Sequence, residues 1–78
     1  MVDIRVGNKF PYYSTDEKKL IEVLKKYKVD KYKYNKYEFY SLKEGVVWII
    51  IGNIIWSLNY DLLKKIMKEF PKLIKKRK

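Results

Sequence analysis

VVWIIIGNIIWSL, residues 46–58, decides how this chain folds, because ten of its thirteen residues are large and apolar and most of the chain around it is polar. A helix that crosses a membrane needs about 20 consecutive apolar residues. This run is shorter and is interrupted by Gly52, Asn53 and Ser57. We therefore expect no transmembrane span, and two possibilities remain for the stretch: a buried helix or a β-hairpin.

The hairpin is the better prediction. A helix over 46–58 would be apolar on every side, so protein would have to surround it completely. A chain of 78 residues offers little material for that. Gly52-Asn53 is a two-residue turn signal between two runs rich in β-branched residues, which favour strands. The helix stays open as the alternative, since tertiary contacts can override such preferences.

A hairpin turning at Gly52-Asn53 sorts its side chains onto two unequal faces. The wholly apolar face carries Val47, Ile49, Ile51, Ile54, Trp56 and Leu58. We expect helices to cover that face. The opposite face carries Ser57 and three large apolar residues, for which we predict an interface with a second subunit or a partner protein: Trp48, Ile50 and Ile55. A three-residue turn would instead pair Trp48 with Trp56, so the register stays open.

Two amphipathic helices flank the apolar stretch in the sequence. Residues 15–28 follow a capping-box signature, Ser14 with Glu17, and carry apolar residues at spacings of three and four. A second helix is predicted to begin after Asn59 as N-cap and to end near Phe70, because proline follows. Residues 71–78 are expected to add a helical turn or to fray as a basic tail.

Strands are predicted in two further places. Val2, Ile4 and Val6 alternate with polar residues, as in a half-buried strand that ends at Gly7-Asn8. Residues 30–42, DKYKYNKYEFYSL, are rich in aromatics that favour strands, but their alternation breaks at Asn35-Lys36. A two-residue turn or a bulge in one long strand would each explain the break, and both stay open.

These elements predict a single α+β domain over residues 1–78, a small antiparallel sheet with two amphipathic helices on one face. Its order is strand, helix, one or two strands, hairpin, helix. That order resembles the one of double-stranded-RNA-binding domains, and KKIMK at residues 64–68 is similar to the lysine-bearing helix of that family. The glycines and small residues that the family has before and within this helix are absent here.

The composition points to binding rather than catalysis. The chain has nineteen lysines and arginines against nine acids, no histidine and no cysteine, with a formal net charge of +10. Such a charge attracts nucleic acid, anionic membranes or acidic proteins, although AT-rich codon usage can also produce a lysine-coated surface. We find no motif for a catalytic pair, a phosphate loop, a metal or a cofactor. We therefore expect a non-enzymatic protein. The N-terminus also lacks the apolar segment of a secretory signal, so we expect the protein to be cytoplasmic.

Basic residues interleaved with tyrosines are typical of surfaces that neutralise phosphates and stack bases. We therefore expect DNA or RNA to bind the following residues: Lys31, Tyr32, Lys33, Tyr34, Lys36, Lys64, Lys65, Lys68, Lys72, Lys75, Lys76 and Arg77. The alternative is a protein-interaction module, a homodimer, adaptor or inhibitor, in which the positive charge is incidental.

Overall fold

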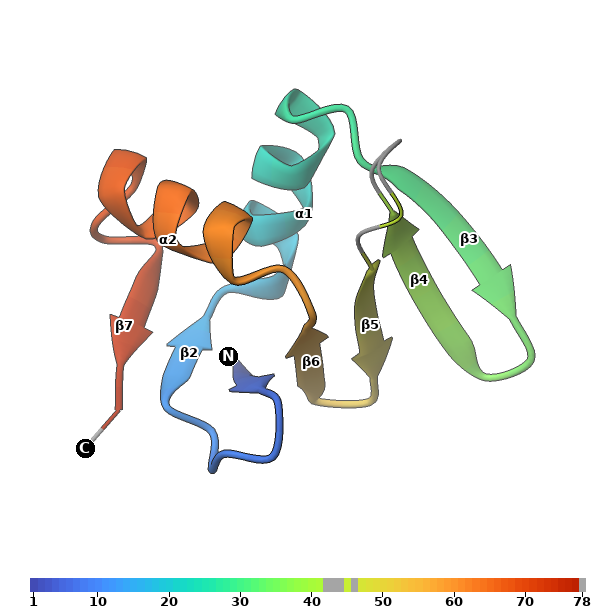
Figure 1. Ribbon diagram of the computed structural model, residues 1–78, viewed down its shortest axis with the longest axis horizontal. Helices are drawn as coiled ribbons and strands as arrows, with labels where there is room; N and C mark the ends of the chain where they lie inside the picture. Colours follow the sequence, from blue (N-terminus) through green and yellow to red (C-terminus); the bar gives the residue numbers. More distant parts are fainter. Residues whose placement is uncertain (42–44, 46, 78) are drawn as a thin grey trace.

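Over residues 1–41, 45 and 47–77, which are those that the computed structural model describes, the chain forms two helices and one seven-stranded sheet (Figure 1). The strand order is β3-β4-β5-β6-β1-β2-β7, and every neighbouring pair is antiparallel except β1 with β6. The strands are β1 (Val2–Val6), β2 (Tyr13–Thr15), β3 (Asp30–Tyr34), β4 (Tyr37–Ser41), β5 (Val47–Ile51), β6 (Ile54–Ser57) and β7 (Ile74–Lys76).

The apolar stretch is the predicted hairpin. β5 and β6 pair Ile51 with Ile54 and Trp48 with Ser57 across the turn at Gly52-Asn53. Gly52 has φ of 60°, a positive value that suits glycine at the first position of a two-residue hairpin turn. The helical alternative and the three-residue turn are both wrong, while Val46 lies outside the described residues.

The aromatic segment that follows the first helix is also a hairpin. β3 and β4 pair Tyr34 with Tyr37 and Tyr32 with Phe39, so the break at Asn35-Lys36 is a turn and not a bulge. Asn35 adopts φ of 54°, in the left-handed region that asparagine tolerates better than most residues. Figure 1 shows this hairpin extending away from the helices at one end of the sheet.

Both helices are capped by side chains. α1 (Glu17–Lys26) begins at Asp16, whose carboxylate accepts hydrogen bonds from the backbone amides of Lys18 and Lys19. The predicted cap at Ser14 is therefore wrong by two residues, because Ser14 belongs to β2. α2 (Tyr60–Glu69) begins at Asn59, as predicted, with the asparagine oxygen 3.1 Å from the backbone nitrogen of Leu62.

The α+β class is confirmed, but the predicted order misses two short strands, β2 and β7. Part of residues 71–78 neither continues the helix nor frays, because Ile74–Lys76 pairs with β2. Two contacts hold it there: Ile74 is buried, and the Thr15 hydroxyl donates a hydrogen bond of 2.9 Å to the carbonyl of Leu73. Burial of Ile74 and this bond outweigh the fraying expected of a charged chain end.

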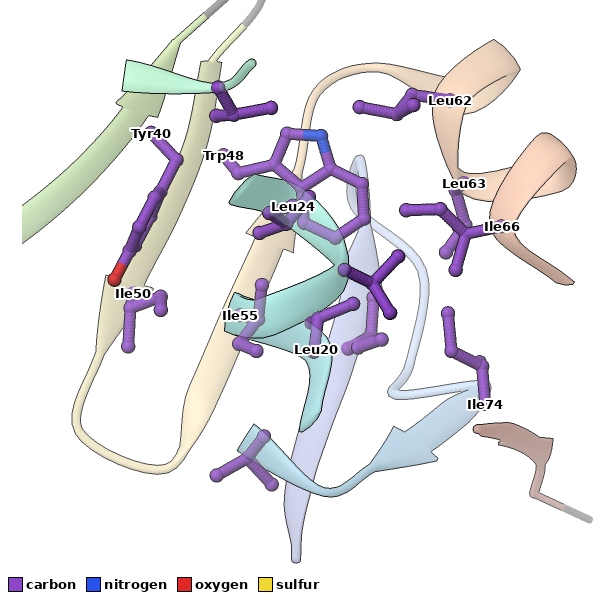
Figure 2. Close-up of a cluster of buried hydrophobic side chains, with 14 of the residues drawn as sticks. Leu20, Leu24, Tyr40, Trp48, Ile50, Ile55, Leu62, Leu63, Ile66 and Ile74 are labelled. Atoms are coloured by element: carbon purple, nitrogen blue, oxygen red, sulfur yellow. The ribbon is translucent and has the colours of Figure 1, made fainter. Parts of the chain in front are cut away.

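The helices cover the opposite face of the hairpin from the one that we predicted. Trp48 and Ile55 are fully buried on the side of the sheet that carries the helices, and Ile50 is 5 % exposed (Figure 2). The interface predicted for these three residues is therefore wrong, because they lie in the core. The parallel register sets this outcome: Ile4 of β1 lies beside Ile55, so the apolar residues of β1 share one face with Trp48.

Candidate nucleic-acid interface

The other face of the sheet is left without a helical cover over the described residues, and we call it the open face. Its central feature is a row of side chains that runs across five adjacent strands. The registers place Tyr32 beside Phe39, Phe39 beside Ile49, Ile49 beside Trp56, and Trp56 beside Arg5. Side chains of directly paired residues point to the same face, so these five lie in line.

A second row runs parallel to the first and changes in character along its length. It begins with aromatic and aliphatic side chains and ends with polar ones: Tyr34, Tyr37, Ile51, Ile54, Asp3, Ser14 and Lys75. Tyr34 is 68 % exposed, and Tyr37 and Ile51 are also exposed. The open face therefore has an aromatic end on β3 and β4, an apolar middle, and a charged end on β1, β2 and β7.

Arg5 and Arg77, which are the only arginines of the chain, both belong to the charged end. The guanidinium carbon of Arg5 lies 4.5 Å from the centre of the Trp56 ring, and its Nε donates a hydrogen bond to the carbonyl of Lys9. Nη1 of Arg77 lies 2.6 Å from Oδ1 of Asp3. Planar guanidinium groups stack on aromatic rings and bind phosphate in a bidentate manner, which lysine does not do.

The structure distributes the predicted nucleic-acid residues over two sides of the molecule. On the open face it places Tyr32, Tyr34, Lys75 and Arg77, with Lys36 at the β3–β4 turn. Strand alternation directs Lys31, Lys33 and Lys76 to the opposite face. The exposed side of α2 carries Lys64, Lys65 and Lys68, and Lys72 lies in the turn after that helix. The twelve residues therefore form no single surface.

Three residues of the open face were missed as binding candidates: Arg5, Phe39 and Trp56. The alternation of Val2, Ile4 and Val6 already places Arg5 on the polar side of its strand. Trp56 was assigned to the buried face of the hairpin, so its availability could not be foreseen. The missing information is the parallel pairing of β1 with β6, which joins residues 51 positions apart in the sequence.

The two tyrosines whose pKa values are raised, Tyr27 and Tyr40, do not belong to the open face. Burial raises the pKa of Tyr40 above its ordinary value, and the nearby charges of Glu38 and Glu17 raise it further. The Tyr27 hydroxyl donates a hydrogen bond to Glu69 on α2, and this bond raises the pKa of Tyr27. Within the described part of the chain, no cluster of acidic side chains could hold a metal ion. None of the described helices is long and apolar enough to span a membrane.

No family model, curated protein or solved structure matches this chain. A functional proposal therefore depends on the geometry of the open face.

Proposed function

We propose that this protein binds single-stranded nucleic acid on the open face, as a non-enzymatic binding protein. The row of Tyr32, Phe39 and Trp56 on three different strands is the observation that supports the proposal. Aromatic side chains that line an open sheet stack on bases of any sequence, each contributing about 1–3 kcal/mol. On the opposite face of the sheet, the two helices cover the corresponding positions.

The charges around the aromatic row suit a phosphate backbone. Arg5, Lys75 and Arg77 lie at one end of the open face, and Lys36 lies at the β3–β4 turn at the other end. Two acids of the described strands share this face: Asp3, whose ion pair with Arg77 offsets one positive charge, and Asp30, which lies on the same side of β3 as Tyr32. A single-stranded nucleic acid that lies along the row would therefore meet cations at both ends of the open face. The protein's net charge of +10 would add to this attraction.

Single strands suit this surface better than duplexes. Bases in a duplex are stacked on one another, so their faces are not accessible to a sheet, whereas unpaired bases can stack on side chains. Duplex readout uses a helix or a narrow ribbon that enters a groove. The broad open face presents rings across several strands, which favours splayed, unpaired bases.

A protein-interaction module is the second candidate, and one observation favours it. The middle of the open face is aliphatic, with Ile49, Ile51 and Ile54 side by side, and Ile51 is 42 % exposed. Exposed apolar patches of this kind bind other proteins, including a second copy of the same chain. Both candidates use the same face, so one set of variants can distinguish them.

Fluorescence anisotropy with a labelled oligothymidine, measured over a series of salt concentrations, tests the first candidate. Binding should weaken steeply as salt rises, since phosphate contacts release counterions. Trp56→Ala should weaken binding by about 5- to 150-fold, the equivalent of one lost stacking contact. Tyr60→Ala is the matched control, because Tyr60 is an exposed aromatic at the start of α2 and not on the open face.

Two outcomes would overturn the nucleic-acid proposal. One is the absence of binding at low salt, and the other is an affinity that depends on Lys64 and Lys65 of α2 but not on Trp56. Sedimentation equilibrium then tests the second candidate. A dimer that Ile51→Lys converts to a monomer would support protein association through the open face.

A further inference from the structure

The outer edge of β3 is the longest unpaired backbone edge of the sheet in the described part of the chain. β3 is the first strand of the sheet order and pairs with β4 alone, and all five of its residues are exposed. The other edge, β7, is only three residues long. Figure 1 shows β3 at the end of the sheet that lies away from α1 and α2. No helix therefore covers the β3 edge, which is the part of a sheet that most readily accepts another strand.

Two lysines carry the backbone groups that face outward from this edge. In a two-residue hairpin, the two residues that flank the turn form two backbone hydrogen bonds with each other. Here these residues are Tyr34 and Tyr37. Bonded and non-bonded pairs alternate along an antiparallel ladder, so Lys31 and Lys33 belong to non-bonded pairs. Their N–H and C=O groups therefore point away from β4. A strand added to β3 would form its hydrogen bonds with these two residues.

The same two lysines disfavour a second copy of β3 as the added strand. When two identical strands pair antiparallel at the sheet edge, residues of the same face oppose one another. Each register that pairs more than one residue of the two β3 strands sets Lys31 against Lys33, or sets one of them against itself. Like charges in directly opposed positions destabilise a strand pair. The ion pair of Lys31 with Glu38 on β4, at 3.7 Å, offsets part of one charge, but Lys33 forms no such pair within the described residues.

We propose that the β3 edge binds an extended acidic segment of a partner protein by strand addition. Acidic residues at alternate positions of that segment would oppose Lys31 and Lys33 on the helix side of the sheet. The residue between them would lie on the open-face side beside Tyr32, where an apolar side chain packs best. This site does not depend on nucleic-acid binding, because its lysines point away from the open face.

The test uses a peptide in which glutamate and valine alternate, added to isotope-labelled protein and followed by NMR. The amides of Lys31 and Lys33 should shift and gain protection from hydrogen exchange, since they become hydrogen-bonded. A peptide of the same composition that repeats Glu-Glu-Val-Val is the peptide control. It carries the same charge but never has glutamates two positions apart, so it cannot place acids opposite both lysines and should bind about tenfold more weakly.

Three variants separate strand addition from general attraction between opposite charges. Lys31→Glu combined with Lys33→Glu should weaken binding of the alternating acidic peptide at least about tenfold. The same variant should bind a peptide that alternates lysine and valine more tightly. Lys64→Glu combined with Lys65→Glu makes the same change of charge on α2 and should keep most of the affinity for the alternating acidic peptide. Lys33→Pro removes one outward amide donor and keeps the pairing with β4, so it should also weaken binding about tenfold.

Equal losses from the α2 variant and the β3 variant would overturn the proposal, because general charge attraction would then explain the binding. Unchanged affinity in Lys33→Pro would overturn it too, since strand addition requires that donor. Circular dichroism of each variant verifies that the fold is kept.

Discussion

The two faces of the β5–β6 hairpin are both largely apolar and yet opposite in environment. Trp48 and Trp56 lie on neighbouring strands, one position apart in the ladder, yet Trp48 is fully buried under the helices and Trp56 lies on the open face. The difference shows that apolar character alone does not decide which face of a sheet becomes the core. The decision depends on what the neighbouring strands add to each face.

Replacing the two tryptophans in turn should give the largest contrast. Trp48→Ala should lower the free energy of unfolding by about 3–5 kcal/mol, because it leaves a cavity between the sheet and both helices. For a domain of this size that loss can abolish folding. Trp56→Ala should cost roughly 1–2 kcal/mol, since its ring already contacts solvent. Urea unfolding followed by circular dichroism measures both, and equal losses would contradict the assignment of faces.

The sequence was sufficient for several of the local elements, although not for the cap of α1 or for β2 and β7. The turn at Gly52-Asn53 and the cap at Asn59 were predictable because each depends on residues close together in the chain. Period-two alternation in Val2–Val6 likewise identified β1. Such features arise from backbone conformation and from neighbouring side chains, which the sequence displays directly.

The candidate site was only partly predictable, because it depends on pairing between distant segments. Tyr32 and Tyr34 were recognised from their alternation with lysines, but the same alternation sends Lys31 and Lys33 to the other face. The apolar patterns of the two hairpin faces gave the wrong ranking, because the more apolar face, which carries Trp56, is the open one. Only the parallel contact of β1 with β6 distinguishes them, and no local pattern encodes that contact.

Two adjacent residues of β2 with hydroxyl side chains, one on each face of the sheet, allow a second comparison of the covered and open faces. The expected effect on the free energy of unfolding is smaller. Thr15 is fully buried and its hydroxyl donates to the Leu73 carbonyl, whereas Ser14 lies on the open face. Thr15→Val keeps the shape but removes the bond, so it should cost about 1–2 kcal/mol and loosen β7. Ser14→Val should change stability by less than about 0.5 kcal/mol. Urea unfolding gives the two costs, and hydrogen exchange of Lys75 and Lys76 reports on β7; similar results for both variants would refute the role of the Thr15 hydroxyl.

Tyr40 on the covered face should make the stability of the fold depend on alkaline pH. Its hydroxyl is buried and donates no hydrogen bond within the described residues, and its pKa is raised in the folded state. As pH rises past the ordinary value of 10.0, the unfolded chain loses this proton first, so stability should fall. Tyr40→Phe should reduce that alkaline loss.

At neutral pH the same substitution should leave stability unchanged or raise it by up to about 1 kcal/mol, because no buried hydroxyl then lacks a partner. Tyr37→Phe on the open face is the control for removing a hydroxyl and should change stability at neutral pH by less than about 0.5 kcal/mol. Thermal unfolding between neutral pH and about pH 11 measures both effects. A marked destabilisation by Tyr40→Phe at neutral pH would show that the hydroxyl has a favourable contact.

Arg5→Lys should have only a small effect on stability and is the most informative about the open face. The substitution keeps the positive charge but loses the planar group that lies over Trp56, so it should cost no more than about 0.5 kcal/mol. If the arginine serves nucleic-acid binding, the same change should weaken oligonucleotide affinity about two- to fivefold, since lysine neither stacks nor binds phosphate in a bidentate manner. A loss of stability without any loss of affinity would instead mean that Arg5 only shields Trp56 from water. The ratio of the two effects therefore tests whether the open face is a binding surface or a second, thinly covered core.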